Sequence, residues 1–415
     1  MKLVRFFIAF LLISCSFSIS FAQKTNDGSG SARAALQSFF SQSSFSRGAD
    51  NDRQDEPQNV PHAVRVALLL PFGSATGYKS ATTNRMTEYY EGFLLAMKDL
   101  KKAGISIDLQ VYNIGTETNL LPSIFNKASM SKVDLVIGGL SDEQTQSIAA
   151  FCSQRNIPYV IPFTSQNASI LNYPNAYQVN MPQTVTYPIV AEAFCKKYIN
   201  ANVILCKKKP TKGNKVDFHV VLERELDAKF VTYTTADADN LFENLQLVLV
   251  PDRLNVIVPD DDSEQMLAIM ANPLKTTAEL HPEFQMSLFG YPSWQSYTSN
   301  LLYRHNASFY SIYYADMASP KVKTFQTTFQ NWYSHNLIAS FPKYGMLGYD
   351  TAMYFIQLIN QYGIAIGSNI NNLKYTGVQT NFNFETVTER SGAINTNLFF
   401  IEYKPNKSIF VTSVK

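Results

Sequence analysis

The sequence predicts an α/β protein made of two consecutive doubly wound lobes. From residue 64 onward, short β-branched or leucine-rich runs alternate with segments of helical periodicity, which is typical of strand-helix-strand units and a mostly parallel sheet. A second series of the same kind begins after Met181-Pro182-Gln183. The tail after Thr376 alternates polar and apolar residues, as antiparallel strands do.

The first series is the clearer of the two. Residues 64–70 form a nearly continuous apolar run that Pro71 stops, so this strand is expected to be covered on both faces. The next helix has one broad apolar stripe and ends before Gly104. The following strands of the first series are expected at 105–114, 133–139 and 159–162.

The second series repeats this alternation, and the chain then returns to two long helices. A helix is expected at 185–198, followed by strands at 202–206, 229–233, 254–259 and 285–290. The long late helices are expected at 321–334 and 347–362, and Gly363 closes the second one.

Composition narrows the class of protein further. The 415 residues are 46% hydrophobic and 16% charged, so the chain can bury a sizeable core. Lys and Arg number 35 against 33 Asp and Glu, and two of the cations, Lys2 and Arg5, lie in a segment expected to be removed. A neutral mature chain gives no electrostatic reason to expect nucleic acid or an anionic membrane as partner.

The N-terminus predicts export. Residues 1–22 have a basic start, an apolar run and Ser20-Phe21-Ala22 before the cut, as in a secretory signal peptide, which predicts a periplasmic protein. Leu12-Ile13-Ser14-Cys15 resembles a bacterial lipobox, so an outer-membrane lipoprotein anchored through Cys15 is the alternative. Residues 23–62 are polar and are expected to form a disordered tether.

No metal, cofactor or enzyme motif is visible. The cysteines at 152, 195 and 206 have no C-x-x-C spacing and are expected to be buried free thiols, and the five histidines are scattered. Nucleophile elbow, phosphate-binding, dinucleotide-binding and zinc-protease motifs are all absent. We therefore expect a protein that is not an enzyme and carries no cofactor, with a hydrolase of unrecognised nucleophile as a weaker alternative.

Four runs occur in the order found in type 1 periplasmic binding proteins. These are the stretch 64–104, the Val-Asp-Leu-Val-Ile-Gly-Gly run at 133–139, the run 161–165 and the helix start at 347–352. The chain from residue 64 to 415 resembles the leucine-isoleucine-valine-binding protein family. The resemblance implies two lobes joined by three crossover segments, with lobe one at 64–183 and 317–375 and lobe two at 184–316 and 376–415.

In open α/β sheets a ligand lies beyond the carboxyl ends of the strands. In lobe one this points to Tyr78 in the loop after the first strand, to Gly139 and Ser141 after the third, and to Thr164 and Ser165 after the fourth. The resemblance implies that the turn after the third strand and the hydroxyls after the fourth hold the carboxylate and amine of an amino acid.

Each of these residues also has a purely structural interpretation. Ser141 with Gln144 has the spacing of a capping box, which would use the Ser141 hydroxyl, and Thr164-Ser165 could simply begin a loop. Asp142 stands where the family usually has a small residue and would repel a carboxylate. This leaves sugars, peptides, cationic compounds or no small ligand open.

The candidates in lobe two are fewer. Asp260 could balance an ammonium group, Trp294 could stack on a ligand, and Tyr187 lies near the hinge. An acidic run at a strand end, such as 260–262, is more often a helix-opening cap, and Asp262 before Ser263-Glu264 suits that role. A single tryptophan is more often packed in a core.

Two functions remain from these observations. The first is an exported solute-binding protein that closes its lobes on a small ligand, amino acid-like or peptide, and passes it to a membrane transporter or sensor. The second is a cell-wall or envelope interaction module of the same fold, such as a regulator of peptidoglycan synthases. The tether and Asp142 favour the second function, whereas the intact order of cleft loops favours the first.

Overall fold

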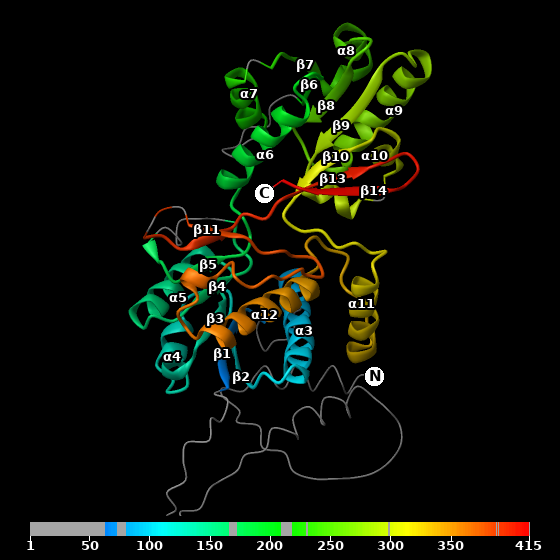
Figure 1. The fold of residues 1–415 in the computed structure, drawn as a ribbon. Helices are drawn as coiled ribbons and strands as arrows, with labels where there is room; N and C mark the ends of the chain where they lie inside the picture. The colour runs from blue at the N-terminus through cyan, green and yellow to red at the C-terminus, as the bar shows by residue number, and fades with distance from the viewer. Residues whose placement is uncertain are drawn as a thin grey trace, which may run out of the picture.

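The protein folds into two lobes, each built around a seven-stranded sheet (Figure 1). The structure is a computed structural model that describes residues 63–72, 80–165, 172–208, 218–229, 231–297, 299–386, 388 and 390–414. The expected signal peptide, with Cys15, and the expected tether lie outside the described residues, as does Tyr78.

The first sheet has the strand order β11-β12-β5-β4-β3-β1-β2. Neighbouring strands from β2 through to β12 are parallel, and β11 is antiparallel to β12. Its strands are β1 (Val64–Leu70), β2 (Ile107–Asn113), β3 (Leu135–Gly138), β4 (Tyr159–Ile161), β5 (Ala176–Gln178), β11 (Phe384–Thr386) and β12 (Ala393–Asn395). The near-continuous burial of β1, β3 and β4 fits strands covered on both faces.

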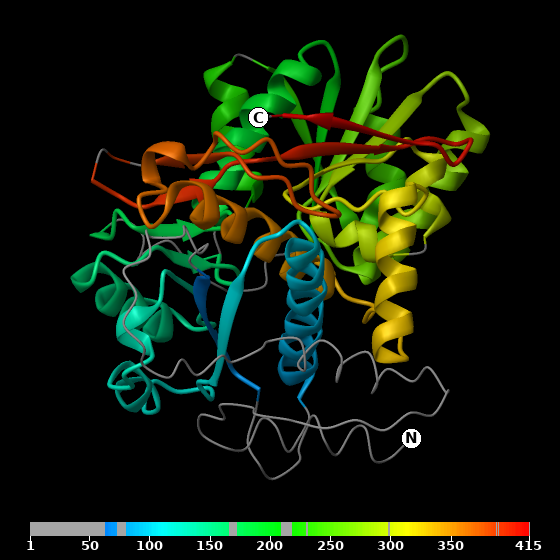
Figure 2. The ribbon, with the colours of Figure 1, turned by 60° about the horizontal axis from the view of Figure 1, so that its bottom comes forward.

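The helices around this sheet include the two long late ones. They are α3 (Ala81–Lys102), α4 (Leu121–Phe125), α5 (Asp142–Gln154), α11 (Pro320–Tyr333) and α12 (Tyr344–Tyr362), with short 3-10 turns η1 (Met130–Lys132) and η5 (Gly367–Asn369). The backbones of α3 and α12 approach so closely that a Cβ on Gly92 would collide with the carbonyl of Gly345. α11 stands beside α3, as Figure 2 shows, and the Tyr333 hydroxyl donates to the Glu91 carbonyl at 2.8 Å.

The second sheet repeats the pattern with the order β14-β13-β10-β9-β8-β6-β7. Its strands are β6 (Asn202–Lys207), β7 (Tyr233–Asp237), β8 (Leu254–Pro259), β9 (Gln285–Gly290), β10 (Ser308–Ser311), β13 (Phe399–Tyr403) and β14 (Ile409–Ser413). β6 to β10 are mutually parallel, and β13 and β14 are antiparallel. The flanking helices are α6 (Gln183–Lys197), α7 (Phe218–Ala228), α8 (Leu241–Val248), α9 (Glu264–Leu280) and α10 (Asn300–Arg304), with η3 (Ala238–Asn240) and η4 (Pro292–Ser296).

The last part of the chain departs from the expected lobe boundaries. The resemblance places residues from 376 onward in lobe two, but β12 pairs with β5 through Ala393 and Ile394, so β11 and β12 extend the first sheet. The chain passes to the second sheet only between Asn395 and Phe399. The alternation of polar and apolar residues predicts strands correctly, but it carries no information about which sheet they join.

A buried carboxylate fixes the start of this last passage. Asp350, in α12, is 0% exposed and accepts hydrogen bonds from the Val378, Gln379 and Thr380 N–H groups at 2.7 to 2.8 Å and from the Tyr375 hydroxyl at 2.7 Å. Asp350 therefore organises the 375–380 loop.

Candidate functional site

The carboxyl ends of both parallel strand sets lie at the junction between the lobes. β5 ends at Gln178, and after four intervening residues the chain begins α6, which belongs to the second lobe (Figure 1). β10 ends at Ser311, and the chain returns to the first lobe and begins α11 at Pro320. Since parallel neighbours end at the same edge of a sheet, strands β1, β3 and β4 of the first sheet and β6, β8 and β9 of the second sheet all end at this junction.

The turn after β3 is tight and internally bonded. Gly139 has φ +79°, and a Cβ there would lie 2.8 Å from the Tyr159 hydroxyl, so only glycine fits without strain. The Ser141 Oγ accepts from the Gln144 N–H at 3.2 Å. The Gln144 Oε1 accepts from the N–H groups of Leu140 and Ser141 at 3.0 and 3.4 Å, which completes a capping box.

This bonding bears directly on the predicted carboxylate site. A ligand carboxylate at the turn would need N–H donors, and those of Leu140 and Ser141 already point to the Gln144 side chain. The Gln144 Nε2 in turn donates to the Gly115 and Glu117 carbonyls at 3.1 Å, so the amide is held from both ends. The expected capping box is present, and a ligand contact at Ser141 stays a prediction.

The residues after β4 reach the same turn. The Thr164 Oγ1 donates to the Asp142 Oδ1 at 3.2 Å, and the Thr164 carbonyl accepts from the Gln178 Nε2 at 3.0 Å. Ser165 is exposed. Asp142 thus connects the two predicted loops of lobe one. The group between these loops is therefore a carboxylate, which does not bind anions.

In lobe two, Asp260 joins two strand ends. Its N–H donates to the Cys206 carbonyl at 3.0 Å, and its Oδ2 accepts from the Lys208 N–H at 2.9 Å. Asp260 is half-buried in this arrangement. Asp261 accepts from the Ser263 N–H at 2.8 Å, but the residue that caps the next helix is Ser263, whose Oγ accepts from the Met266 N–H at 3.2 Å, so the acidic run is not itself the cap.

The aromatic candidates of lobe two are core residues. Trp294 is 0% exposed, and its ring fills the space beside Gly290 and contacts the ring of Phe309 at 6.2 Å between centroids. The prediction that Trp294 stacks on a cleft ligand is therefore wrong. Gly290 has no side chain, and this leaves room for the Trp294 ring in the core. Tyr187 is only 7% exposed, packed edge-on to Phe218 at 5.4 Å.

The structure adds a group of residues in lobe one that the sequence did not single out. Phe163 follows β4, and its ring lies 6.3 Å from that of Tyr344, the first residue of α12. The guanidinium of Arg85, near the start of α3, lies 5.7 Å from the centre of the Tyr344 ring. These three are joined only by tertiary packing across residues 85 to 344, so no local sequence pattern could have found them.

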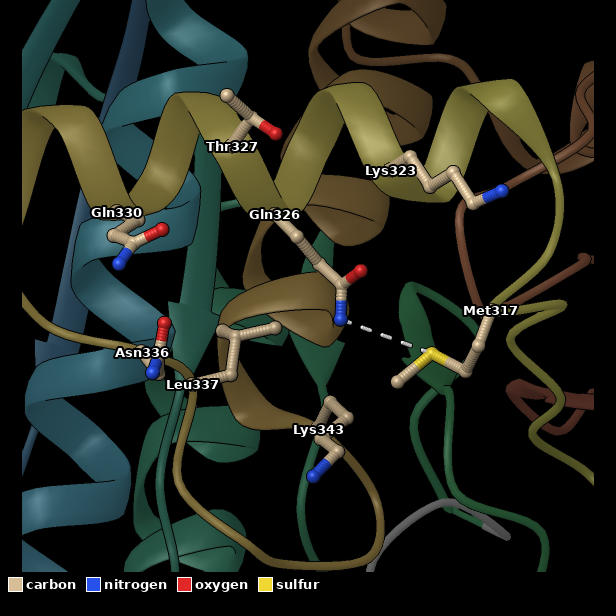
Figure 3. Close-up of a pocket in the computed structure, with 8 residues that line it drawn as sticks. All are labelled: Met317, Lys323, Gln326, Thr327, Gln330, Asn336, Leu337 and Lys343. Atoms are coloured by element: carbon tan, nitrogen blue, oxygen red, sulfur yellow. Dashed lines mark hydrogen bonds between the residues drawn. The ribbon is translucent and has the colours of Figure 1, made fainter.

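A separate hollow of about 330 Å³ lies between α11 and the segment 334–343 (Figure 3). It contains none of the predicted site residues; it is lined by Met317, Lys323, Gln326, Thr327, Gln330, Asn336, Leu337 and Lys343. The Gln326 amide points to the Met317 sulfur at 3.9 Å, whereas the ammonium groups of the two lysines point away from one another in Figure 3. The hollow therefore presents amides and apolar groups without converging charges.

Metal-ligating groups do not gather in the described part of the chain. Within it, no cluster of three or more His, Cys, Asp and Glu side chains has a geometry that could hold a metal ion. Cys152, Cys195 and Cys206 are free and buried, as expected, and burial raises the pKa of each thiol. The helices of these described residues include none that is long and apolar enough to cross a membrane.

Comparison with known proteins identifies the fold. No family model and no curated protein matches the sequence. Among solved structures, a Rhodospirillum rubrum protein assigned to a branched-chain amino acid ABC transporter is 12% identical, covers 85% of this chain and 100% of its own, and has a TM-score of 0.62. A branched-chain amino acid ABC transporter periplasmic ligand-binding protein of Burkholderia xenovorans is 12% identical over 84% of this chain and 94% of its own, with a TM-score of 0.55.

A third solved structure is an ABC transporter substrate-binding protein of Desulfitobacterium hafniense in complex with Leu. It is 13% identical, covers 85% of this chain and 100% of its own, and has a TM-score of 0.52. Identities this low establish architecture alone. With two doubly wound lobes, three connecting passages and these structural neighbours, the chain has the two-lobed α/β fold of the type 1 periplasmic binding proteins.

Proposed function

We propose that this chain is a non-catalytic solute-binding protein that takes up a small ligand at the junction of its two lobes and encloses it by a hinge movement. The observation that carries the proposal is that both sheets bring their carboxyl ends, the ligand-binding edges of open α/β sheets, to this junction. The structural neighbours, which include an ABC transporter periplasmic ligand-binding protein and an ABC transporter substrate-binding protein in complex with Leu, support it.

Export and delivery to a transporter complete the proposal. The signal-peptide pattern of residues 1–22 supports a periplasmic location, with lipidation at Cys15 as the alternative. The N-terminal residue of the protein recovered from its host distinguishes the two. Gln23 would support cleavage after Ala22, whereas a lipid-modified Cys15 would support anchoring.

A thermal-shift screen of the mature chain with amino acids, sugars, short peptides and muropeptides tests the binding function. A ligand at 100 times its Kd should add about 2.7 kcal/mol to the free energy of unfolding. Small-angle scattering should then give a smaller radius of gyration with the ligand than without it. A screen without any shift would contradict the proposal.

The envelope interaction module is retained as the second candidate because of one observation. The N–H groups of Leu140 and Ser141, which a bound amino acid carboxylate would need, are occupied by Gln144. A chain that binds no small ligand but is retained from envelope extracts by a peptidoglycan synthase would favour this second function.

A further inference from the structure

Polar, aromatic and charged side chains form a row at the junction edge of lobe one, and their chemical character changes from one end of the row to the other. At one end the Asp142 carboxylate accepts from the Thr164 hydroxyl. Phe163, directly before Thr164, continues the row to Tyr344, and Arg85 lies against Tyr344 at the other end. The row therefore runs from an anion through two aromatic rings to a cation, and this inference rests on the function proposed above.

The Asp142 end of the row is unsuited to an anionic group. The nearby N–H donors are used by Gln144, and the Asp142 carboxylate itself would repel a second negative charge. This end suits an uncharged or hydrogen-bond-donating part of a ligand.

The Arg85 end has the opposite character. Arg85 is exposed, and none of the described carboxylates forms an ion pair with it; the nearest acidic residue along α3, Glu88, uses its oxygens to accept the N–H groups of Ile338 and Gly345. The first turn of α3 carries no acidic residue either. A guanidinium is a planar donor that binds carboxylates in a bidentate fashion, and its position over Tyr344 limits its freedom before binding.

The two rings between these ends provide a surface for a flat, apolar body. Phe163 is held edge-on by Tyr89 at 4.8 Å and is tilted by 30° to Tyr344, so the pair of rings is braced from one side. Both remain partly exposed. Rings in offset or edge contact at centroid distances of about 4.5–7 Å attract aromatic partners.

We infer that the ligand of this site is a monoanionic organic acid with a planar apolar body. Its carboxylate is held by Arg85, and its body lies on Phe163 and Tyr344. The ligand carboxylate thus binds at the Arg85 end of the row. The resemblance alone would place it at the other end, at the Ser141 turn.

Isothermal titration of the mature chain with 3-phenylpropionate tests this inference, with 3-phenylpropanol, leucine and glucose as comparison probes. 3-Phenylpropionate should bind at least tenfold more tightly than the uncharged alcohol, and its affinity should fall as salt is raised. Arg85→Gln should weaken binding at least tenfold and Arg85→Lys less, because lysine keeps the charge but loses the fork. Tyr344→Ala should also weaken it. Lys102→Gln, on the far end of the same helix and exposed, is the matched control and should change nothing.

The outcomes separate this inference from the function on which it rests. Binding of leucine or glucose without binding of 3-phenylpropionate, or 3-phenylpropionate binding that Arg85→Gln leaves unchanged in a variant with native circular dichroism, would overturn the inference and leave the solute-binding function standing. Absence of binding by every probe, together with a thermal-shift screen without any shift, would overturn both.

Discussion

The two lobes share one topology but offer different chemistry at the edges that lie at their junction. In lobe one, side chains of several kinds line the edge: Asp142, Thr164, Phe163 and Tyr344 are half-exposed, and Arg85 is exposed. In lobe two the large side chains after the strands are buried: Tyr291 is 8% exposed, with its hydroxyl bound to the Pro259 carbonyl, and Trp294 is inaccessible. Under the proposed function, this difference favours recognition of the ligand by lobe one and closure over it by lobe two.

Replacing Trp294 by alanine gives the sharpest test of this difference. Because the ring is fully buried beside Gly290, we expect Trp294→Ala to lower the free energy of unfolding by about 3–5 kcal/mol. Phe163→Ala, at the half-exposed position in lobe one, should cost clearly less and should mainly reduce ligand affinity. Urea unfolding of both variants measures the difference; equal, small losses would show that Trp294 is not a core residue.

Asp350 tests the anchoring of the last passage to lobe one. Asp350→Ala would leave three backbone N–H groups and the Tyr375 hydroxyl without their acceptor in a buried place, at a cost of about 3 kcal/mol or more. Asp350→Asn keeps one acceptor oxygen but turns its NH2 group toward the other two donors, so it should recover only part of this loss. Hydrogen exchange should rise first at Val378, Gln379 and Thr380, and an increase spread evenly over both sheets would contradict a local anchor.

The fold was more predictable from the sequence than the site. Apolar runs such as 64–70 and the capping spacing of Ser141 and Gln144 are local patterns, and the structure contains both features. The sheet that β12 joins, the burial of Trp294 beside Gly290, and the approach of Arg85 to Tyr344 depend on residues far apart in the chain. Periodicity reports which face of an element is buried, but it does not report which element lies against it.

Substitutions of Ser141 distinguish a helix-capping role of its hydroxyl from a ligand contact. If its hydroxyl serves only the Gln144 N–H, Ser141→Ala should lower the free energy of unfolding by about 1 kcal/mol and leave ligand affinity within twofold. Ser141→Asn, which retains a capping oxygen, is the matched control and should restore most of the stability. A large loss of affinity with unchanged stability would instead return the ligand anion to the turn after β3.

Two histidines, one in each lobe, extend the comparison to pH. His335, in lobe one, lies 3.3 Å from the Glu91 carboxylate, and this hydrogen bond raises its pKa to about 9. His305, in lobe two, is buried, and desolvation lowers its pKa to about 4. The unfolded pKa of histidine is about 6.5 in both cases, so the two shifts have opposite signs.

The opposite signs predict losses of stability at opposite ends of the pH range. The contribution of His335 is fully present below about pH 6.5 and is lost as pH rises through 9; because its side chain is 45% exposed, screening keeps it below about 1 kcal/mol. The buried His305 stays neutral in the folded protein, whereas in the unfolded chain it takes up a proton as pH falls below about 6.5 toward 4. The free energy of unfolding should therefore fall by about 1 kcal/mol between pH 7 and 5.5. Urea unfolding from pH 5.5 to 9.5 should show His335→Gln flattening only the alkaline side, and imidazole NMR titrations should give the two pKa values directly. Two histidines that titrate together near 6.5 would mean that neither lobe shifts its histidine as the packing implies.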